Sequence, residues 1–156
     1  MTMLQYWIRL LLGAGLALGA LMPQVAMAEP ACWFRFVTSI SFGAYNVYAT
    51  GANNNGVGSL TIRCQNSHRS FAVTLSTGQS NSYAQRVMKS GANVLNYNLY
   101  TSTARTTIWG DASDGSSSLS VSGNSTTSLN VFGQIPAGQD AAVGNYTDTI
   151  IATVNF

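Results

Sequence analysis

Residues 147–156 read TDTIIATVNF, and apolar side chains recur in this stretch at every second position. One face of the extended chain would carry Ile150, Ala152, Val154 and Phe156. The opposite face would carry Thr149, Ile151, Thr153 and Asn155. A period of two is typical of a β-strand with one buried face. The stretch therefore predicts a strand whose Ile150 face packs on an apolar core.

The same alternation recurs in the preceding part of the chain. It is clearest in the four segments 60–64, 71–75, 95–99 and 129–135. Stretches rich in Gly, Asn, Ser and Pro separate these runs and predict turns. After Glu29 no segment shows the apolar stripe of an amphipathic helix, and the Ser-rich residues 113–128 are interpreted as an edge strand with loops. Short strands with regularly spaced turns predict an all-β fold, a sandwich or a barrel.

The N-terminal segment has the three parts of a secretory signal peptide. Arg9 precedes an apolar run over residues 10–21, and Ala26-Met27-Ala28 supplies the small residues that signal peptidase requires. A membrane anchor is the alternative, but this run is shorter than the roughly twenty residues that a bilayer needs. The sequence predicts cleavage after Ala28, one domain over residues 29–156, and no membrane span in the mature protein.

Charge is sparse in this chain, since Asp, Glu, Lys and Arg make up 8% of it and the formal net charge is +2. The basic residues are scattered and form no run. Because binding to nucleic acid requires several clustered cations, the composition argues against that partner. A polar but mostly uncharged surface is more typical of secreted assemblies than of cytosolic enzymes.

The two cysteines, Cys32 and Cys64, predict one disulfide in an exported protein. On the chain-entropy model, closing this loop would stabilise the fold by roughly 3–4 kcal/mol. A zinc site is the competing interpretation. It would need four donors at short spacing, and His68 is the chain's single histidine. We expect no metal and no cofactor.

Catalytic motifs are missing from the sequence, which contains no Gly-x-Ser-x-Gly elbow, no Walker loop and no carboxylate pair beside a base. His68 with Ser67 or Ser70 is the sole candidate for nucleophilic chemistry. Neighbouring residues on a turn rarely reach the geometry in which a base activates a hydroxyl. We therefore expect a protein that is not an enzyme.

Large aromatic residues supply the candidate core. Phe42 and Tyr45 flank Gly43 at an expected chain reversal, and three more aromatic residues complete the set: Tyr97, Trp109 and Phe132. Each would contribute a few kcal/mol on burial. A platform on which sugar rings stack is the alternative role for these side chains.

The order and spacing of several short motifs match one known family. They are Phe42-Gly43-Ala44-Tyr45, residues 58–64, Leu75-Ser76-Thr77-Gly78, Arg86-Val87-Met88, residues 95–100, Trp109-Gly110-Asp111, residues 131–139 and residues 144–149. With Cys32 and the terminal strand, they resemble the spore coat protein U domain, which a spore-coat protein family shares with the archaic chaperone–usher pilins.

This resemblance implies an immunoglobulin-like β-sandwich that lacks its last strand. In such pilins a periplasmic chaperone first covers the exposed core with its own strand. After passage through an outer-membrane usher, the N-terminal extension of a neighbouring pilin replaces that strand. Ile150, Ala152, Val154 and Phe156 would line one side of the groove, and no further strand is expected after Phe156. The alternative is an edge strand in a complete sandwich.

One departure from the family pattern concerns the donor segment. Polymerising pilins carry alternating apolar residues ahead of the first cysteine, whereas only Glu29, Pro30 and Ala31 would precede Cys32 after cleavage. We expect an exported surface-pilus subunit, active in adhesion or biofilm formation, that accepts a strand without donating one, as a terminal or tip subunit does. A stand-alone coat protein, or a module that binds carbohydrates or surfaces, is the alternative.

Overall fold

The computed structural model describes residues 32–65, 70–122 and 125–155. It contains eight β-strands and one short 3-10 helix, η1 (Gly78–Ser80). The strands are β1 (Cys32–Ser41), β2 (Val57–Cys64), β3 (Ser70–Leu75), β4 (Arg86–Ser90), β5 (Asn93–Tyr100), β6 (Leu119–Ser122), β7 (Thr126–Gln134) and β8 (Ala152–Asn155). The predictions made for the leader, for Ser67 and His68, and for Phe156 lie outside the described residues.

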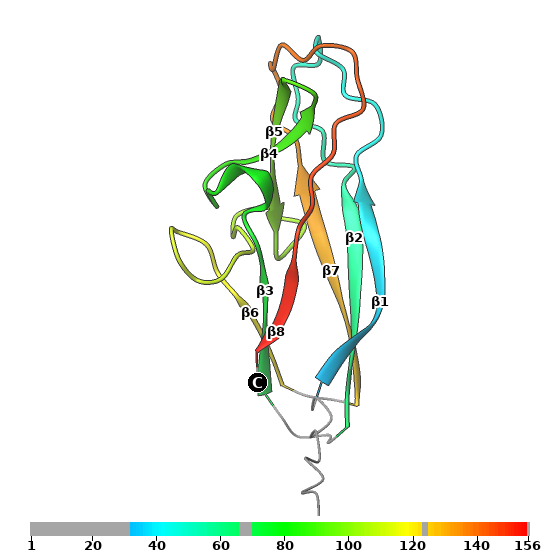
Figure 1. Ribbon diagram of the computed structural model, residues 1–156, viewed down its shortest axis with the longest axis vertical. Coiled ribbons are helices and arrows are strands. Elements are labelled where there is room, and N and C mark those ends of the chain that lie inside the picture. The colour runs from blue at the N-terminus through cyan, green and yellow to red at the C-terminus, as the bar shows by residue number, and fades with distance from the viewer. Residues whose placement is uncertain (1–31, 66–69, 123–124, 156) are drawn as a thin grey trace, which may run out of the picture.

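Two sheets face each other, as Figure 1 shows. The larger sheet has the strand order β1-β2-β7-β5-β4, and the smaller has the order β6-β3-β8. All strand pairs are antiparallel. The predicted all-β sandwich is confirmed, and β6 is an edge strand in the Ser-rich region as expected. In the described part of the chain, no helix has the length and hydropathy needed to span a membrane.

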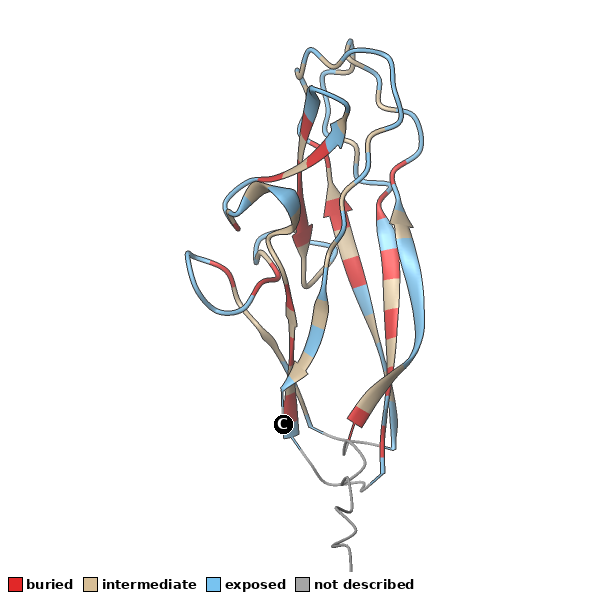
Figure 2. Cartoon of the chain, in the orientation of Figure 1, coloured by how far each residue is buried: buried red, intermediate tan, exposed pale blue. Residues whose placement is uncertain are grey.

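Alternating side chains build the core between the sheets, where the buried positions in Figure 2 lie. Ile62 of β2, Val73 of β3 and Leu99 of β5 are fully buried, as is Trp109 in the loop after β5. The Trp109 indole donates a hydrogen bond from Nε1 to the Val73 carbonyl at 2.8 Å. This bond ties the Trp109 loop to the smaller sheet.

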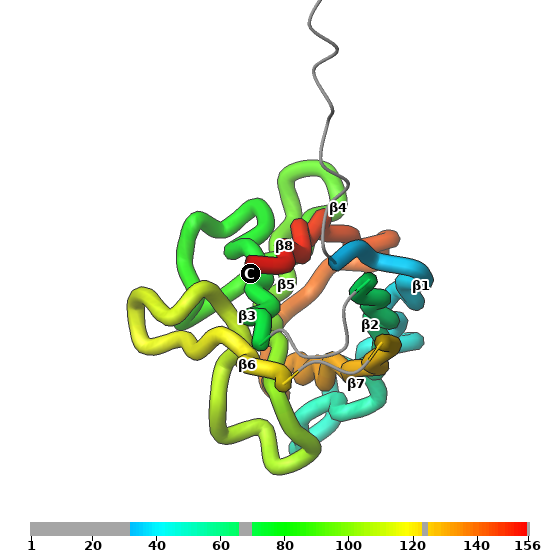
Figure 3. Tube along the Cα trace, turned by 90° about the horizontal axis from the view of Figure 1, so that it is seen from below, coloured from blue at the N-terminus to red at the C-terminus, as the bar shows by residue number. Residues whose placement is uncertain are grey.

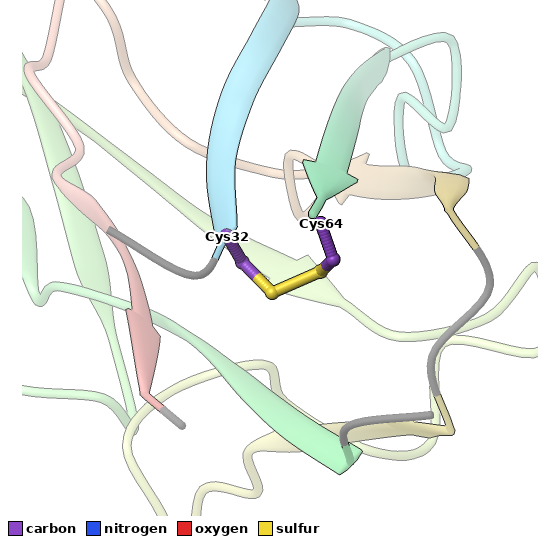
Figure 4. Close-up of a disulfide and its surroundings, with 2 residues drawn as sticks. All are labelled: Cys32 and Cys64. Atoms are coloured by element: carbon purple, nitrogen blue, oxygen red, sulfur yellow. A yellow bond between two sulfur atoms is a disulfide. The ribbon is translucent and has the colours of Figure 1, made fainter. Parts of the chain in front are cut away.

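The predicted disulfide forms at the end of the sandwich where β1 begins and β2 ends (Figure 4). Cys32 pairs directly with Cys64 in the β1–β2 ladder. Both half-cystines are buried. The covalent bond therefore fixes the register of β1 against the sheet at this end.

The prediction that Phe132 belongs to the aromatic core is wrong. Its side chain is only half-buried, while its neighbours Val131 and Gly133 are buried. Phe132 lies opposite Val57, which is 49% exposed. Since Val131 and Gly133 face inward, the period of two places Phe132 on the outer face of the sheet. The space above Gly133 is filled instead by the ring of Phe42.

The terminal strand is shorter than the alternation predicted. Thr147 makes an isolated bridge to Lys89 of β4, whereas β8 pairs with β3 from Ala152 onward. The chain therefore crosses from the larger to the smaller sheet between these residues. The predicted alternation of faces still holds before β8, since Ile150 is half-buried and Ile151 is 65% exposed.

Candidate functional site

A groove of about 300 Å³ opens between β1 and β8. Each of these strands is the edge of its sheet among the described residues, and they belong to different sheets. Figure 3, which looks along the sandwich, shows β8 and β1 at the same side of the ring of strands. The groove thus lies between the edge strands of the two sheets, and no described strand pairs with both of them.

The β8 wall of the groove is the one that the terminal alternation predicts. Ile150 and Ala152 line it. Val154 is half-buried and packs on the hydrophobic core beyond the lining residues. The structure therefore brings these three predicted side chains to one face.

The β1 wall was not anticipated from the sequence. Residues 37–40 line it, and Val37 is 63% exposed. The ladder with β2 slips between Phe34 and Phe36, so that Phe34 lies opposite Ile62 and Val37 opposite Leu60. Since Ile62 and Leu60 both face the core, the bulge brings two residues three positions apart to the same face. Because the bulge breaks the period of two, alternation along the sequence does not reveal this wall. The only indication in the sequence was the high density of apolar residues over 32–40.

The floor of the groove is apolar and buried. It consists of side chains from four strands of both sheets, namely Leu60, Leu75, Leu99 and Val131. At the end away from the disulfide, Phe42 and Tyr97 meet edge to face with ring centroids 5.9 Å apart. Phe42, Tyr97 and Trp109 are all buried, and Tyr45 is half-buried. Tyr45 donates its hydroxyl hydrogen to the Pro136 carbonyl.

Asp148 is the charged residue among the described residues that line the groove. Its Oδ2 accepts a hydrogen bond from the Tyr97 hydroxyl at 2.7 Å. Its Oδ1 accepts from the backbone amides of Gln79 and Thr149 at 3.0 and 2.7 Å. Burial, followed by the hydrogen bond to Asp148, raises the pKa of Tyr97 well above its ordinary value. The phenol therefore stays protonated and continues to donate to the carboxylate.

Arg86 of β4 pairs with Tyr97, which lines the groove, and its side chain is fully buried. Its guanidinium donates to the Ser76 carbonyl from Nε at 2.9 Å and from Nη2 at 2.8 Å, to Asn98 Oδ1 from Nη1 at 2.7 Å, and to the Trp109 carbonyl from Nη2 at 2.7 Å. Burial lowers the pKa of Arg86. Ser76 in turn pairs with Ile151 through its amide and its hydroxyl. This chain of contacts connects β4 to the residue that precedes β8.

A second hollow of about 820 Å³ lies at the end of the sandwich away from the disulfide. Loop residues 43–48 and 141–147 line it, and the described lining residues carry no charged side chain. Tyr48 is 89% exposed there, and Val143 is fully exposed. Separately, the described residues contain no group of three or more His, Cys, Asp or Glu that could hold a metal ion.

Comparison with known proteins identifies the family. The family model of the spore coat protein U domain matches residues 19–153. The chain belongs to the spore coat protein U domain family. "Protein U" of Myxococcus xanthus is 28% identical to this spore coat protein U domain in an alignment of 130 positions, which covers 76% of this chain and 72% of that protein.

Two solved structures are similar to this spore coat protein U domain. One is the CsuC-CsuE chaperone-tip adhesion subunit pre-assembly complex from the archaic chaperone-usher Csu pili of Acinetobacter baumannii, with 24% identity and a TM-score of 0.48. The match covers 80% of this chain but only 39% of that chain. The other is HdaB, the E. coli Hda pilus minor tip subunit, with 10% identity and a TM-score of 0.47. That match covers 81% of this chain and 84% of that chain.

Proposed function

We propose that this protein is a structural subunit of a bacterial surface pilus and that it accepts a β-strand from another protein in the groove between β1 and β8. The observation that carries the proposal is the meeting of two edge strands from different sheets across an apolar groove. Membership of the spore coat protein U domain family adds to it. We propose no catalytic role.

Edge strands present backbone N–H and C=O groups that a further strand can pair with. An inserted strand would hydrogen-bond to a groove wall and place alternate side chains over Leu60, Leu75, Leu99 and Val131. Burial of apolar area would supply the affinity at roughly 25 cal/mol per Å² before the costs of ordering the strand. The groove thus offers both parts of strand addition, main-chain pairing and side-chain pockets.

The partners that follow from this proposal are a periplasmic pilus chaperone, an outer-membrane usher and a neighbouring pilin. The protein would pass through the periplasm to the cell surface, where the fibre serves adhesion or biofilm formation. Cleavage after Ala28 would leave residues 29–31 ahead of Cys32. We therefore propose the terminal position of a fibre, where a subunit receives a strand and donates none.

Surface binding by a stand-alone secreted module is the second candidate function. The uncharged hollow with exposed Tyr48 and Val143 favours it, because aromatic and apolar side chains at an exposed end suit contact with neutral surfaces or sugars. The hollow adjoins the groove, since both share five lining residues: Ile40, Phe42, Met88, Tyr146 and Thr147. The two functions are compatible in one subunit, because Tyr48 and Val143 line the hollow alone.

A pair of substitutions on β1 tests strand acceptance. Val37 and Phe36 are both 63% exposed, but Val37 lines the groove, whereas Phe36 lies opposite Thr61 on the outer face. Val37→Asp places an unpaired charge where the strand docks, which costs several kcal/mol. The probe is a synthetic peptide of about ten alternating valine and threonine residues, which would extend over roughly 33 Å.

Binding of the fluorescent peptide to the mature, disulfide-bonded protein is measured by anisotropy. We expect Val37→Asp to weaken binding by about a hundredfold or more. Phe36→Asp should leave it within about threefold, because that face stays in solvent. Equal effects of the two variants, or no saturable binding to the wild type, would reject the groove as a strand acceptor.

A further inference from the structure

The groove contains one anionic position in an otherwise neutral lining. Of the described residues along it, Asp148 alone is charged, and it lies four residues before Ala152, near the end marked by Phe42 and Tyr97. The side chains around it are predominantly apolar. A strand that fills the groove would remove water from this carboxylate as well as from the core.

The hydrogen bonds of Asp148 leave part of its acceptor capacity open. A carboxylate offers about four lone-pair positions, and three neutral donors contact this one: the Tyr97 hydroxyl and the amides of Gln79 and Thr149. These donors fix the orientation of the carboxylate without neutralising its charge. Tyr97 is 4% exposed and supports Asp148 from the core side.

Arg86 is a buried cation on the strand that pairs with Tyr97. Its charge and that of Asp148 attract each other through space. The four hydrogen bonds of the guanidinium end on the Ser76 carbonyl, the Asn98 amide oxygen and the Trp109 carbonyl. Arg86 therefore moderates the field at Asp148 but does not occupy the open acceptor position.

A purely apolar strand would cover this carboxylate without replacing its lost water, and covering an uncompensated charge is costly. We infer that the strand that fills the groove carries a lysine or arginine opposite Asp148, among otherwise alternating apolar side chains. This inference rests on the proposed strand acceptance and specifies the chemistry of the partner. The basic side chain would donate to the open position of the carboxylate and complement its charge.

The ion pair would also determine the register of the inserted strand. In an apolar groove, a strand that slips by two residues presents the same face and similar contacts. One charged position breaks this degeneracy, because a slip leaves both Asp148 and the basic side chain without a partner. The pair would thus add specificity for position even where its net contribution to affinity is small.

The test uses a series of valine–threonine peptides in which one inward position is scanned. Each position carries lysine, its apolar isostere norleucine, or glutamate, and binding to the mature wild-type protein is measured at low salt. We expect one position at which lysine binds about tenfold more tightly than norleucine. At that position glutamate should bind most weakly. Asp148→Asn keeps an oxygen for the amides of Gln79 and Thr149, and its NH2 group can donate to the Tyr97 hydroxyl oxygen. Because the charge is gone, this variant should abolish the preference for lysine.

Asp140→Asn is the matched control, because Asp140 is exposed and lies outside the groove lining. It should keep the preference for lysine. If lysine and norleucine peptides bind equally well at every position, the inference is overturned while strand acceptance stands. If the preference for lysine survives in Asp148→Asn, the inference is likewise overturned. If no peptide of any kind binds to folded protein, strand acceptance and the inference fall together.

Discussion

The guanidinium of Arg86 is fully buried and is held by four hydrogen bonds. Three oxygen acceptors converge on it, from Ser76, Asn98 and Trp109, and the Tyr83 ring lies 5.2 Å from its central carbon. Neutral acceptors replace the carboxylate that a buried cation often pairs with. The residue connects β4 with the end of β3 and the Trp109 loop.

Substitution of Arg86 is expected to be strongly destabilising. Arg86→Met retains the apolar stem but leaves the three buried acceptors without their donor, and we expect the free energy of unfolding to fall by about 2–5 kcal/mol. Chemical denaturation of the purified variant measures this. Arg63→Met on the exposed face of β2 should change stability by no more than about 0.5 kcal/mol. Similar stability of both variants would contradict a structural role for the Arg86 contacts.

The raised pKa of the Tyr97 phenol predicts that the free energy of unfolding decreases at alkaline pH. Burial and Asp148 raise the pKa of its phenol above the ordinary value of 10.0. Above about pH 10 the unfolded chain releases this proton while the folded protein keeps it. The contribution of the Tyr97 phenol to the free energy of unfolding is therefore fully present below that pH and is lost as the pH rises beyond it. Tyr97→Phe removes this contribution.

The decrease in unfolding free energy between about pH 9 and about pH 11 should therefore be smaller in Tyr97→Phe than in the wild type. Burial also raises the pKa values of Tyr83 and Tyr100, and these residues are present in both proteins. Tyr48→Phe alters an exposed side chain and serves as the control. An unchanged slope in Tyr97→Phe would refute the assignment.

Among the elements, β1 depends on a glycine in its neighbour. A Cβ on Gly58 of β2 would lie 2.8 Å from the Thr38 carbonyl oxygen and 2.6 Å from Ile40 Cγ1. Thr38 and Ile40 belong to the β1 wall of the groove. Gly58 therefore permits the close approach of β1 at its second register slip, between Thr38 and Ser41.

Gly58→Ala should displace this part of β1. We expect a loss of about 1–3 kcal/mol in stability from overpacking, together with weaker binding of the valine–threonine peptide. Gly51→Ala is the matched control, since a Cβ there meets no atom within 4 Å. Unaltered peptide affinity in a destabilised Gly58→Ala protein would show that the β1 wall does not contribute to strand binding.

At the scale of the whole molecule, β1 begins and β8 ends at the same end of the sandwich (Figure 1). Cleavage after Ala28 would leave three residues ahead of Cys32, which reach roughly 10 Å, whereas a strand of five or six residues spans roughly 17–20 Å. The mature protein alone is therefore expected to remain monomeric. An alternating apolar segment grafted ahead of Cys32 should produce self-assembly or self-complementation.

Intact mass of the secreted protein identifies its N-terminus, and size-exclusion chromatography with electron microscopy measures its assembly. Monomers from the unmodified chain and fibres or a stabilised monomer from the grafted chain are the expected results. Concentration-dependent fibres from the unmodified mature protein would contradict the terminal position that we propose. They would require a donor segment elsewhere in the chain.

The sequence by itself determined the features that depend on local periodicity and chemistry. Alternation over 71–75 and 95–99 placed Phe71, Val73 and Leu75, and then Leu95 and Leu99, in the core, because successive side chains of a strand always point to opposite faces. The pair of cysteines in an exported chain predicted the disulfide. The alternation after Asp148 likewise predicted the β8 face of the groove.

Only the tertiary structure decided the features that depend on pairing between distant segments. The bulge in β1 is visible only against β2, so the second wall of the groove had no periodic signal. The sequence did not indicate which residues Arg86 and Asp148 contact. The Arg86 partners lie 10 to 23 positions away, and two of the three Asp148 partners, Tyr97 and Gln79, lie 51 and 69 positions away. Local periodicity assigns a residue to a face, but which residues meet across the core depends on how the sheets pack.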